Sequence, residues 1–267
     1  MTPSALILCG GEGRRMGALN PKALIPVGPR ALIIQLIGHL INNGVVDICL
    51  CLGHYSDAIL DCLAKNGWLR QKGTNYYRQQ RHLGAVGRSP RLHISNAGVN
   101  ATAAQRLLVA RKLVQPPTIV CYGDTLADIS IKKLILRHQN SSADATVTVA
   151  RSRSPYGHVT ISDRNIVTAF REKPMLGSPV NLGFILLGSD ALDRLTPEGL
   201  ETSLLPQLAT ERRLAAYEHK GALFASLTRP MLYTLSSDGV RAISHGFHFV
   251  SLNGLSLKVS ARLAMPP

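Results

Sequence analysis

Residues 4–9 form a short apolar run that leads directly into a cluster of glycines. An apolar run of this length, followed at once by Gly10, Gly11 and Gly13, is typical of a buried parallel strand that ends in a tight loop. Glycines in such a loop let backbone amides approach a phosphate closely, because no Cβ stands in the way. This junction therefore predicts an α/β fold whose first strand carries a phosphate-binding loop.

Strand and helix patterns alternate along the rest of the chain. Residues 31–43 place Leu and Ile on one helical face and end at Gly44, which is suited to close a helix. We expect further helices near 56–65, 102–114, 130–138, 189–196 and 201–211 and from Pro230, strands near 45–52, 91–95, 118–122, 145–150, 182–187, 214–218 and 222–227, and a hairpin over 159–170. This order predicts a Rossmann-like, mixed but mostly parallel sheet flanked by helices.

The length of 267 residues fits one large domain, residues 1–245, with a short C-terminal extension, residues 246–267. No run approaches the roughly 20 apolar residues that span a bilayer, and the N-terminal residues lack the features of a secretory signal. We therefore expect a cytoplasmic protein without membrane contact. The odd number of cysteines and their apolar surroundings predict buried core residues at Cys9, Cys49, Cys51, Cys62 and Cys121.

The formal net charge of +14 indicates an anionic partner. Basic residues are spread along the chain, in short pairs such as Arg14-Arg15 and Arg212-Arg213, without an RNA-binding aromatic signature or zinc-finger spacing. A nucleic acid is therefore the less favoured partner, and phosphorylated small molecules account for the same charge. For most of these residues, an ordinary basic surface is the simpler interpretation.

Three groups of residues can carry phosphate chemistry. Arg14, Arg15 and Lys22 add positive charge to the glycine loop, which lacks the Lys-Ser/Thr ending of a P-loop. Asp124 follows a buried strand, at the sheet edge where α/β proteins bind ligands, and its carboxylate can hold Mg²⁺ between triphosphate oxygens. Nearby Asp128 has a competing interpretation as a helix-capping residue.

The third group lies at and after the predicted hairpin. Glu172 can accept hydrogen bonds from sugar hydroxyls, Lys173 can pair with a sugar phosphate, and Asn181 can donate to or accept from a hydroxyl. Residues of these types in a turn also form ordinary solvated charge pairs. The group is informative only together with the other two.

In this order the three groups resemble the sugar-1-phosphate nucleotidyltransferase family, and most of all its glucose-1-phosphate cytidylyltransferases. The resemblance covers residues 4–235 and rests on the segments LILCGGEGRRMGALNPKALIPVG, YGDTLADI, YGHVTISDRNIVTAFREKP and NLGFILL. It implies that a nucleoside triphosphate and a sugar 1-phosphate react with Mg²⁺ to give a nucleotide sugar and pyrophosphate. It also implies nucleotide binding by Gly10, Gly11, Gly13, Arg14 and Gln105, catalysis by Arg15, Lys22 and Asp124, metal binding by Asp124, and sugar-phosphate binding by Gly157, Glu172, Lys173 and Asn181.

The chain departs from the family pattern at three places. Ser226 stands where the family has a second metal-binding aspartate, and Ala103-Ala104-Gln105 stands where it often carries glycine. Arg14 replaces a threonine, and the segment GRRMG is similar to the corresponding segment of molybdenum cofactor guanylyltransferases. The alternatives are therefore a weakly active or inactive nucleotide-sugar-binding homologue, or a guanylyltransferase acting on a heptose phosphate or the molybdenum cofactor. A homo-oligomer is compatible with the sequence.

Overall fold

The structure is a computed structural model that describes residues 2–12, 21–79, 89–154, 156–226, 230–236 and 239–243, with side chains described through residue 221. Gly13, Arg14, Arg15 and the extension 246–267 lie outside these ranges, so the expectations for them stay predictions.

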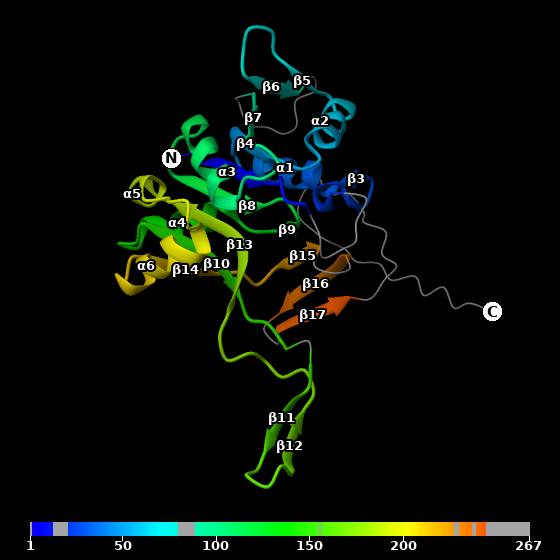
Figure 1. Cartoon of the computed structure of the whole chain (residues 1–267), viewed down its shortest axis with the longest axis vertical. Helices are drawn as coiled ribbons and strands as arrows, with labels where there is room; N and C mark the ends of the chain where they lie inside the picture. The colour runs from blue at the N-terminus through cyan, green and yellow to red at the C-terminus, as the bar shows by residue number, and fades with distance from the viewer. Residues whose placement is uncertain are drawn as a thin grey trace, which may run out of the picture.

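A nine-stranded sheet in the order β14-β10-β13-β8-β1-β4-β7-β6-β5 forms the centre of the molecule (Figure 1). Its strands are β1 Ser4–Leu8, β4 Asp47–Leu52, β5 Trp68–Arg70, β6 Tyr76–Gln79, β7 Arg91–Asn96, β8 Thr118–Tyr122, β10 Ala145–Ala150, β13 Val180–Leu187 and β14 Leu214–Glu218. All run in one direction except β13 and β6. The prediction of a mixed, mostly parallel sheet is confirmed.

Helices pack on both faces of this sheet. They are α1 Leu32–Asn42, α2 Ser56–Lys65, α3 Ala103–Ala110, α4 Ile131–Gln139, α5 Ser189–Asp193 and α6 Leu205–Thr210, with the short helical turns η2 Lys22–Leu24, η3 Arg111–Leu113 and η4 Leu200–Leu204. The alternation of side chains along β1 separates two hydrophobic cores. Ala5 and Ile7 belong to the core with α1, α2 and α4, whereas Leu6 belongs to the core with α3, α5 and α6.

Two smaller units extend the fold beyond the sheet. Strands β9 Thr125–Ala127, β15 Ala222–Ser226, β16 Pro230–Ser236 and β17 Gly239–Ile243 form a four-stranded sheet in the order β17-β16-β15-β9. Strands β11 His158–Ile161 and β12 Val167–Arg171 form a two-stranded arm that projects away from the nine-stranded sheet (Figure 1). Strands β2 Pro26–Val27 and β3 Arg30–Ala31 make a short hairpin before α1.

Most predicted elements are confirmed within a few residues, including the end of α1, where Gly44 has a φ of +90°. The helix predicted from Pro230 is wrong, because this segment is β16, which pairs on both sides with β15 and β17. Ladder pairing with two neighbours overrides the local helical pattern there. The prediction for the cysteines holds except at Cys62, which is only partly buried. In the described part of the chain, no helix has both the length and the apolar character needed to cross a bilayer.

Candidate functional site

Lys22 and Asp124 meet at the edge of the nine-stranded sheet where β1 and β8 end. The Lys22 Nζ atom lies 3.2 Å from Asp124 Oδ2, although 102 residues separate the two in sequence. Lys22 opens η2, after the glycine loop that follows β1, and Asp124 lies in the turn that follows β8. The fold therefore brings together the predicted phosphate-binding lysine and the predicted metal ligand.

Tight packing of the strand ends fixes the position of this pair. The amide of Gly123 donates to the carbonyl of Leu8 at 2.8 Å, which continues the pairing of β8 with β1. A Cβ on Gly123 would stand 2.8 Å from Cys9 Cβ, closer than side chains approach one another. Only glycine fits before Asp124, because the segments that follow β1 and β8 stay in contact as they leave the sheet.

The two described glycines of the phosphate loop differ in what surrounds them. A Cβ on Gly10 would stand 2.5 Å from Arg106 Nε and 2.6 Å from the amide nitrogen of Gly53. At Gly11, no heavy atom of the described residues lies within 4 Å of that position. Gly10 is therefore required by the protein's own packing, whereas a Cβ at Gly11 would meet none of the described residues.

Arg106 is a residue near the site that the sequence analysis missed. Its side chain comes from α3 and reaches the carboxyl end of β4, where Nε donates to the Leu52 carbonyl at 3.2 Å. Arg106 is only 6% exposed. Its place on the buried side of α3, four residues before Ala110, is a signal that helical periodicity could have detected.

The thiols beside the site are not suited to act as nucleophiles. Burial, with a further contribution from Cys49, raises the pKa of Cys9 to about 12. Burial also raises the pKa of Cys121, in β8. Both therefore stay protonated at neutral pH.

The predicted sugar-phosphate residues Gly157, Glu172 and Lys173 lie at the base of the arm. A Cβ on Gly157 would stand 2.6 Å from Phe170 Cζ and 3.0 Å from Glu172 Oε2, so the two ends of the arm touch there. Glu172 and Lys173 side chains are each 62% exposed, with Lys173 Nζ 3.8 Å from Glu172 Oε1. In this structure they form the solvated charge pair that was the simpler interpretation, and their role with sugar phosphate stays a prediction.

Asn181 lies in β13, next to the Asp124 side of the sheet. Its Oδ1 accepts a hydrogen bond from the Gly183 amide at 2.9 Å. Gly183 has a φ of +74°, and a Cβ there would stand 2.5 Å from Cδ2 of Tyr122, the last residue of β8. The start of β13 is thus tied to the strand that precedes Asp124, while the hydroxyl-binding role of Asn181 stays a prediction.

Three other predicted residues have structural surroundings that bear on their roles. Gln105 Oε1 accepts from the Thr102 amide at 2.8 Å, and Thr102 Oγ1 accepts from the Gln105 amide, which makes a capping box for α3. Asp128 does not cap α4, because Ser130 does, and the Asp128 carboxylate lies 3.0 Å from His219 Nε2. The side chain of Ser226, the last residue of β15, is outside the described residues, so its effect on metal binding stays a prediction.

The donors at Asp124 suit a metal ion that the substrate helps to hold. Among the described residues, no three His, Cys, Asp or Glu side chains form a metal-binding group. Mg²⁺ in nucleotide enzymes is held by one or two carboxylates together with substrate phosphates. A single partly exposed carboxylate beside Lys22, the lysine predicted to bind phosphate, fits that arrangement.

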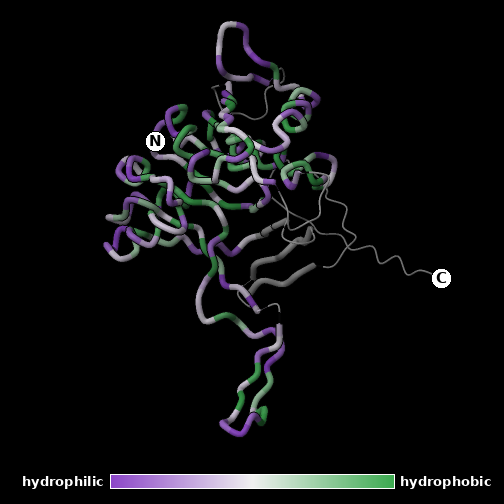
Figure 2. Tube along the Cα trace, viewed as in Figure 1, coloured by the Kyte–Doolittle hydropathy of each residue, from purple (hydrophilic) through white to green (hydrophobic). Residues whose placement is uncertain are grey.

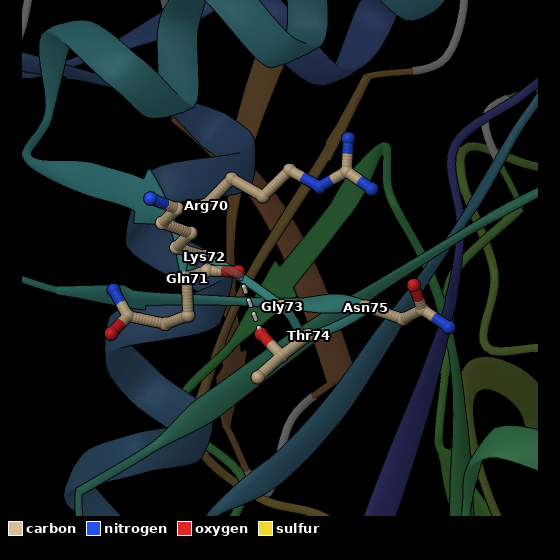
Figure 3. A pocket seen from close by; sticks show the side chains of 6 residues that line it. All are labelled: Arg70, Gln71, Lys72, Gly73, Thr74 and Asn75. Atoms are coloured by element: carbon tan, nitrogen blue, oxygen red, sulfur yellow. Dashed lines mark hydrogen bonds between the residues drawn. The ribbon is translucent and has the colours of Figure 1, made fainter.

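A concave surface elsewhere, at the turn between β5 and β6, lacks these features. It is lined by one continuous segment, Arg70 to Asn75 (Figure 3). Thr74 Oγ1 donates to the Gln71 carbonyl at 2.9 Å, which closes the turn on itself. This turn joins β5 and β6, the last two strands at one side of the sheet, whereas Lys22 and Asp124 lie near the ends of the central strands β1 and β8.

The chain is similar in sequence to known proteins of one family. The nucleotidyl transferase model matches residues 4–211. A probable glucose-1-phosphate cytidylyltransferase of Bacillus subtilis is 30% identical over 226 residues, covering 81% of this chain and 88% of the relative. A mannose-1-phosphate guanyltransferase of Saccharomyces cerevisiae is 26% identical over 229 residues, covering 81% of this chain and 59% of the relative.

Solved structures agree with these matches at the level of the fold. HddC from Yersinia pseudotuberculosis superposes with a TM-score of 0.59 at 19% identity, covering 84% of this chain and 93% of that chain. The family match spans both Lys22 and Asp124, as well as the arm. The chain belongs to the nucleotidyl transferase family.

Proposed function

We propose that the protein transfers a nucleoside monophosphate from a nucleoside triphosphate to a sugar 1-phosphate, releasing pyrophosphate. The observation that carries the proposal is the contact between Lys22 and Asp124, at 3.2 Å, at the carboxyl ends of β1 and β8. This is the edge where open α/β sheets bind ligands. The names of the relatives, a cytidylyltransferase and guanyltransferases of sugar 1-phosphates, support the substrate class.

In this reaction, an oxygen of the sugar phosphate attacks the α-phosphorus of the triphosphate. The new P–O bond forms as the bond to the β-phosphate breaks, and pyrophosphate leaves with the bonding electrons. Lys22 would donate to a phosphoryl oxygen and stabilise its negative charge, while open space at Gly11 would let loop amides approach the phosphates. Alignment of the two substrates accounts for much of the acceleration in such a displacement.

Asp124 is the residue that would hold a divalent metal ion, and enzymes of this family generally use one. We propose Mg²⁺, which when bound neutralises charge on the phosphate oxygens. Asp124 would exchange its contact with Lys22 for the metal as the nucleotide enters. The Lys22 ammonium would then be free to donate to a phosphate oxygen.

At the sugar end, we propose that Glu172, Lys173 and Asn181 bind the sugar phosphate. Glu172 and Lys173 are exposed and adjacent, so both are accessible to a second substrate. Gly157 would leave room beside Glu172, because any side chain there would meet the Glu172 carboxylate and the Phe170 ring. These assignments rest on chemistry and on the family resemblance.

The test is a substrate panel. CTP, GTP, UTP and dTTP are each combined with glucose 1-phosphate, mannose 1-phosphate and a heptose 1-phosphate, with Mg²⁺, and pyrophosphate release is measured. We expect turnover with CTP and glucose 1-phosphate, and a GTP-specific reaction would instead identify a guanylyltransferase. If no pair reacts while a nucleotide or nucleotide sugar raises the melting temperature, the protein is a nucleotide-sugar-binding homologue and the proposal fails.

A further inference from the structure

Arg106 is a buried guanidinium that lies against the phosphate loop. Its Nε donates to the Leu52 carbonyl at 3.2 Å, and its Nη2 donates to the carbonyls of Gly98 and Val99 at 3.3 and 3.2 Å. These three carbonyls belong to the end of β4 and to the loop before α3. The arginine fork therefore joins two segments at the same edge of the sheet as Lys22 and Asp124.

The niche for this guanidinium is built from glycines. A Cβ on Gly10 would stand 2.5 Å from Arg106 Nε, and a Cβ on Gly53 would stand 2.7 Å from the same atom. Gly10 is the first glycine of the phosphate loop, and its carbonyl accepts a hydrogen bond from the His54 amide at 3.0 Å. The loop therefore starts in direct contact with a cation that the rest of the protein covers.

The charge on Arg106 has no counter-ion in the part of the chain that the structure describes. Its hydrogen-bond partners are neutral carbonyls, and the described residues form no ion pair with it. The neighbouring thiols of Cys9 and Cys51 are neutral, since burial raises the pKa of Cys9, and a hydrogen bond with Cys49 together with burial raises the pKa of Cys51. Burial lowers the pKa of Arg106 itself, but an arginine side chain stays protonated in proteins.

A buried charge without a counter-ion is costly, because water is replaced by a medium of lower dielectric constant. The same medium screens the charge weakly, so the field of the guanidinium extends further than that of a surface lysine. A polyphosphate held by the loop would supply the missing negative charge. Joining two loops through three neutral carbonyls does not by itself require a buried charge, because an uncharged donor could make such hydrogen bonds at a lower desolvation cost.

We propose that Arg106 is a positioning residue that gives the phosphate loop a fixed positive potential and so selects for the polyphosphate part of the nucleotide. The inference rests on the proposed function and deepens it, because it names the part of the substrate that this residue favours. Arg106 acts through the backbone of Gly10 and through its field, without touching the substrate. Its contribution grows with the number of phosphates and does not depend on the base.

The experiment compares Arg106→Met, Arg106→Gln and Arg106→Lys with the wild-type protein. Calorimetry with Mg²⁺ measures the Kd of inorganic pyrophosphate, and of the mono- and triphosphate of the nucleoside preferred in the substrate panel. We expect Arg106→Met and Arg106→Gln to weaken the binding of pyrophosphate and of the triphosphate about tenfold or more, equivalent to ~1.4 kcal/mol, and to weaken monophosphate binding less. Arg106→Lys keeps the positive charge but loses the guanidinium fork. We expect its dissociation constants to stay within about threefold of those of the wild-type protein.

Arg91→Met is the matched control, because Arg91 lies at the opposite ends of the strands. Its guanidinium pairs with Asp47 at 2.6 and 2.8 Å, where β4 and β7 begin. Its loss changes the net charge equally and should leave all three dissociation constants unchanged. Glutamine keeps a donor for the Leu52 carbonyl, so the comparison stands even if the methionine variant fails to fold.

The outcomes separate this inference from the proposed function. If wild-type protein binds neither pyrophosphate nor any triphosphate, both are overturned. If it binds them and the charge-removing variants bind equally well, or lose mono- and triphosphate affinity by the same factor, the inference alone is overturned. The same holds if Arg106→Lys loses as much affinity as Arg106→Gln, because the fork and not the charge would then matter.

Discussion

The centre of the sheet and the projecting arm carry the two halves of the proposed site in opposite surroundings. Strands β1 and β8 are buried along nearly their whole length; Asp124 lies in the turn after β8, and Lys22 follows the glycine loop after β1. Every residue of β11 and β12 is exposed. Buried strands therefore hold Lys22 and Asp124 in place, whereas Glu172 and Lys173 depend on a ribbon that has no core of its own.

The side chains of the arm make this contrast sharper. Val159 and Phe170 face each other across the ribbon and are 49% and 64% exposed. Figure 2 shows apolar segments along the arm, beside polar ones. A two-stranded ribbon in water is marginally stable by itself. We therefore expect small changes in the packing of the sheet to affect phosphate chemistry, and small changes in the arm to be tolerated.

The largest effect is expected for Asp124→Asn. The change keeps the shape of the side chain but removes the charge that would hold the metal, so pyrophosphate release should fall about 10²–10³-fold. The fold should survive, because the Asp124 side chain is 35% exposed. Asp47→Asn, at the opposite edge of the sheet, should leave the rate nearly unchanged. A wild-type rate for Asp124→Asn would remove Asp124 from the site.

The next largest effect is a loss of stability in Gly123→Ala. The new Cβ would stand 2.8 Å from Cys9 Cβ and 3.0 Å from the Leu8 carbonyl oxygen. Relief of this overlap should lower the free energy of unfolding by about 1–3 kcal/mol, measured by urea denaturation. Gly38→Ala is the control, since nothing among the described residues lies within 4 Å of its Cβ position in α1. If the free energy of unfolding of Gly123→Ala equals that of the wild-type protein, the ends of β1 and β8 are packed less tightly than the distances imply.

The same contrast explains what the sequence could predict. The apolar runs of β1 and β8 and the period of α1 identified the sheet and its helices, because buried elements leave strong local patterns. The segment from Pro230 was assigned to a helix, although β16 pairs with its sequence neighbours β15 and β17, because the residues of one strand do not show the hydrogen-bonded ladder that it forms with other strands. Sequence order likewise cannot show that two loops 102 residues apart meet.

For the candidate site, the sequence predicted residues from their type and their position after a strand, but it did not predict their contacts. Lys22 and Asp124 were predicted from their places after strands, and the structure brings them together. Arg106 was missed because an arginine in an Arg- and Leu-rich helix is usually solvated, although its position on the buried side of α3 was a signal of burial. The roles of Glu172 and Lys173 still depend on a ligand, because exposed side chains carry no packing constraint.

A smaller effect is expected for Lys173→Met on the arm. Lys173 is 62% exposed, so the change should leave stability and nucleotide binding unaltered. It should raise the KM for the sugar phosphate about tenfold with little change in kcat, because one charged contact to that phosphate is lost. Steady-state kinetics measure the split. Lys72→Met, on the β5–β6 turn, is the control, and an equal KM for both variants would place sugar phosphate elsewhere.

The smallest effect is expected for Phe170→Ser, near the base of the arm, where Phe170 pairs with Val159. Because the side chain is already 64% exposed, its removal should change the free energy of unfolding by no more than about 0.5 kcal/mol in urea denaturation. A loss comparable to that of Gly123→Ala would mean that something covers Phe170 in solution. Repeating the denaturation over a range of protein concentrations then identifies the cover: a midpoint that rises with concentration in wild type, and not in Phe170→Ser, would indicate a second copy of the chain, because only association depends on concentration.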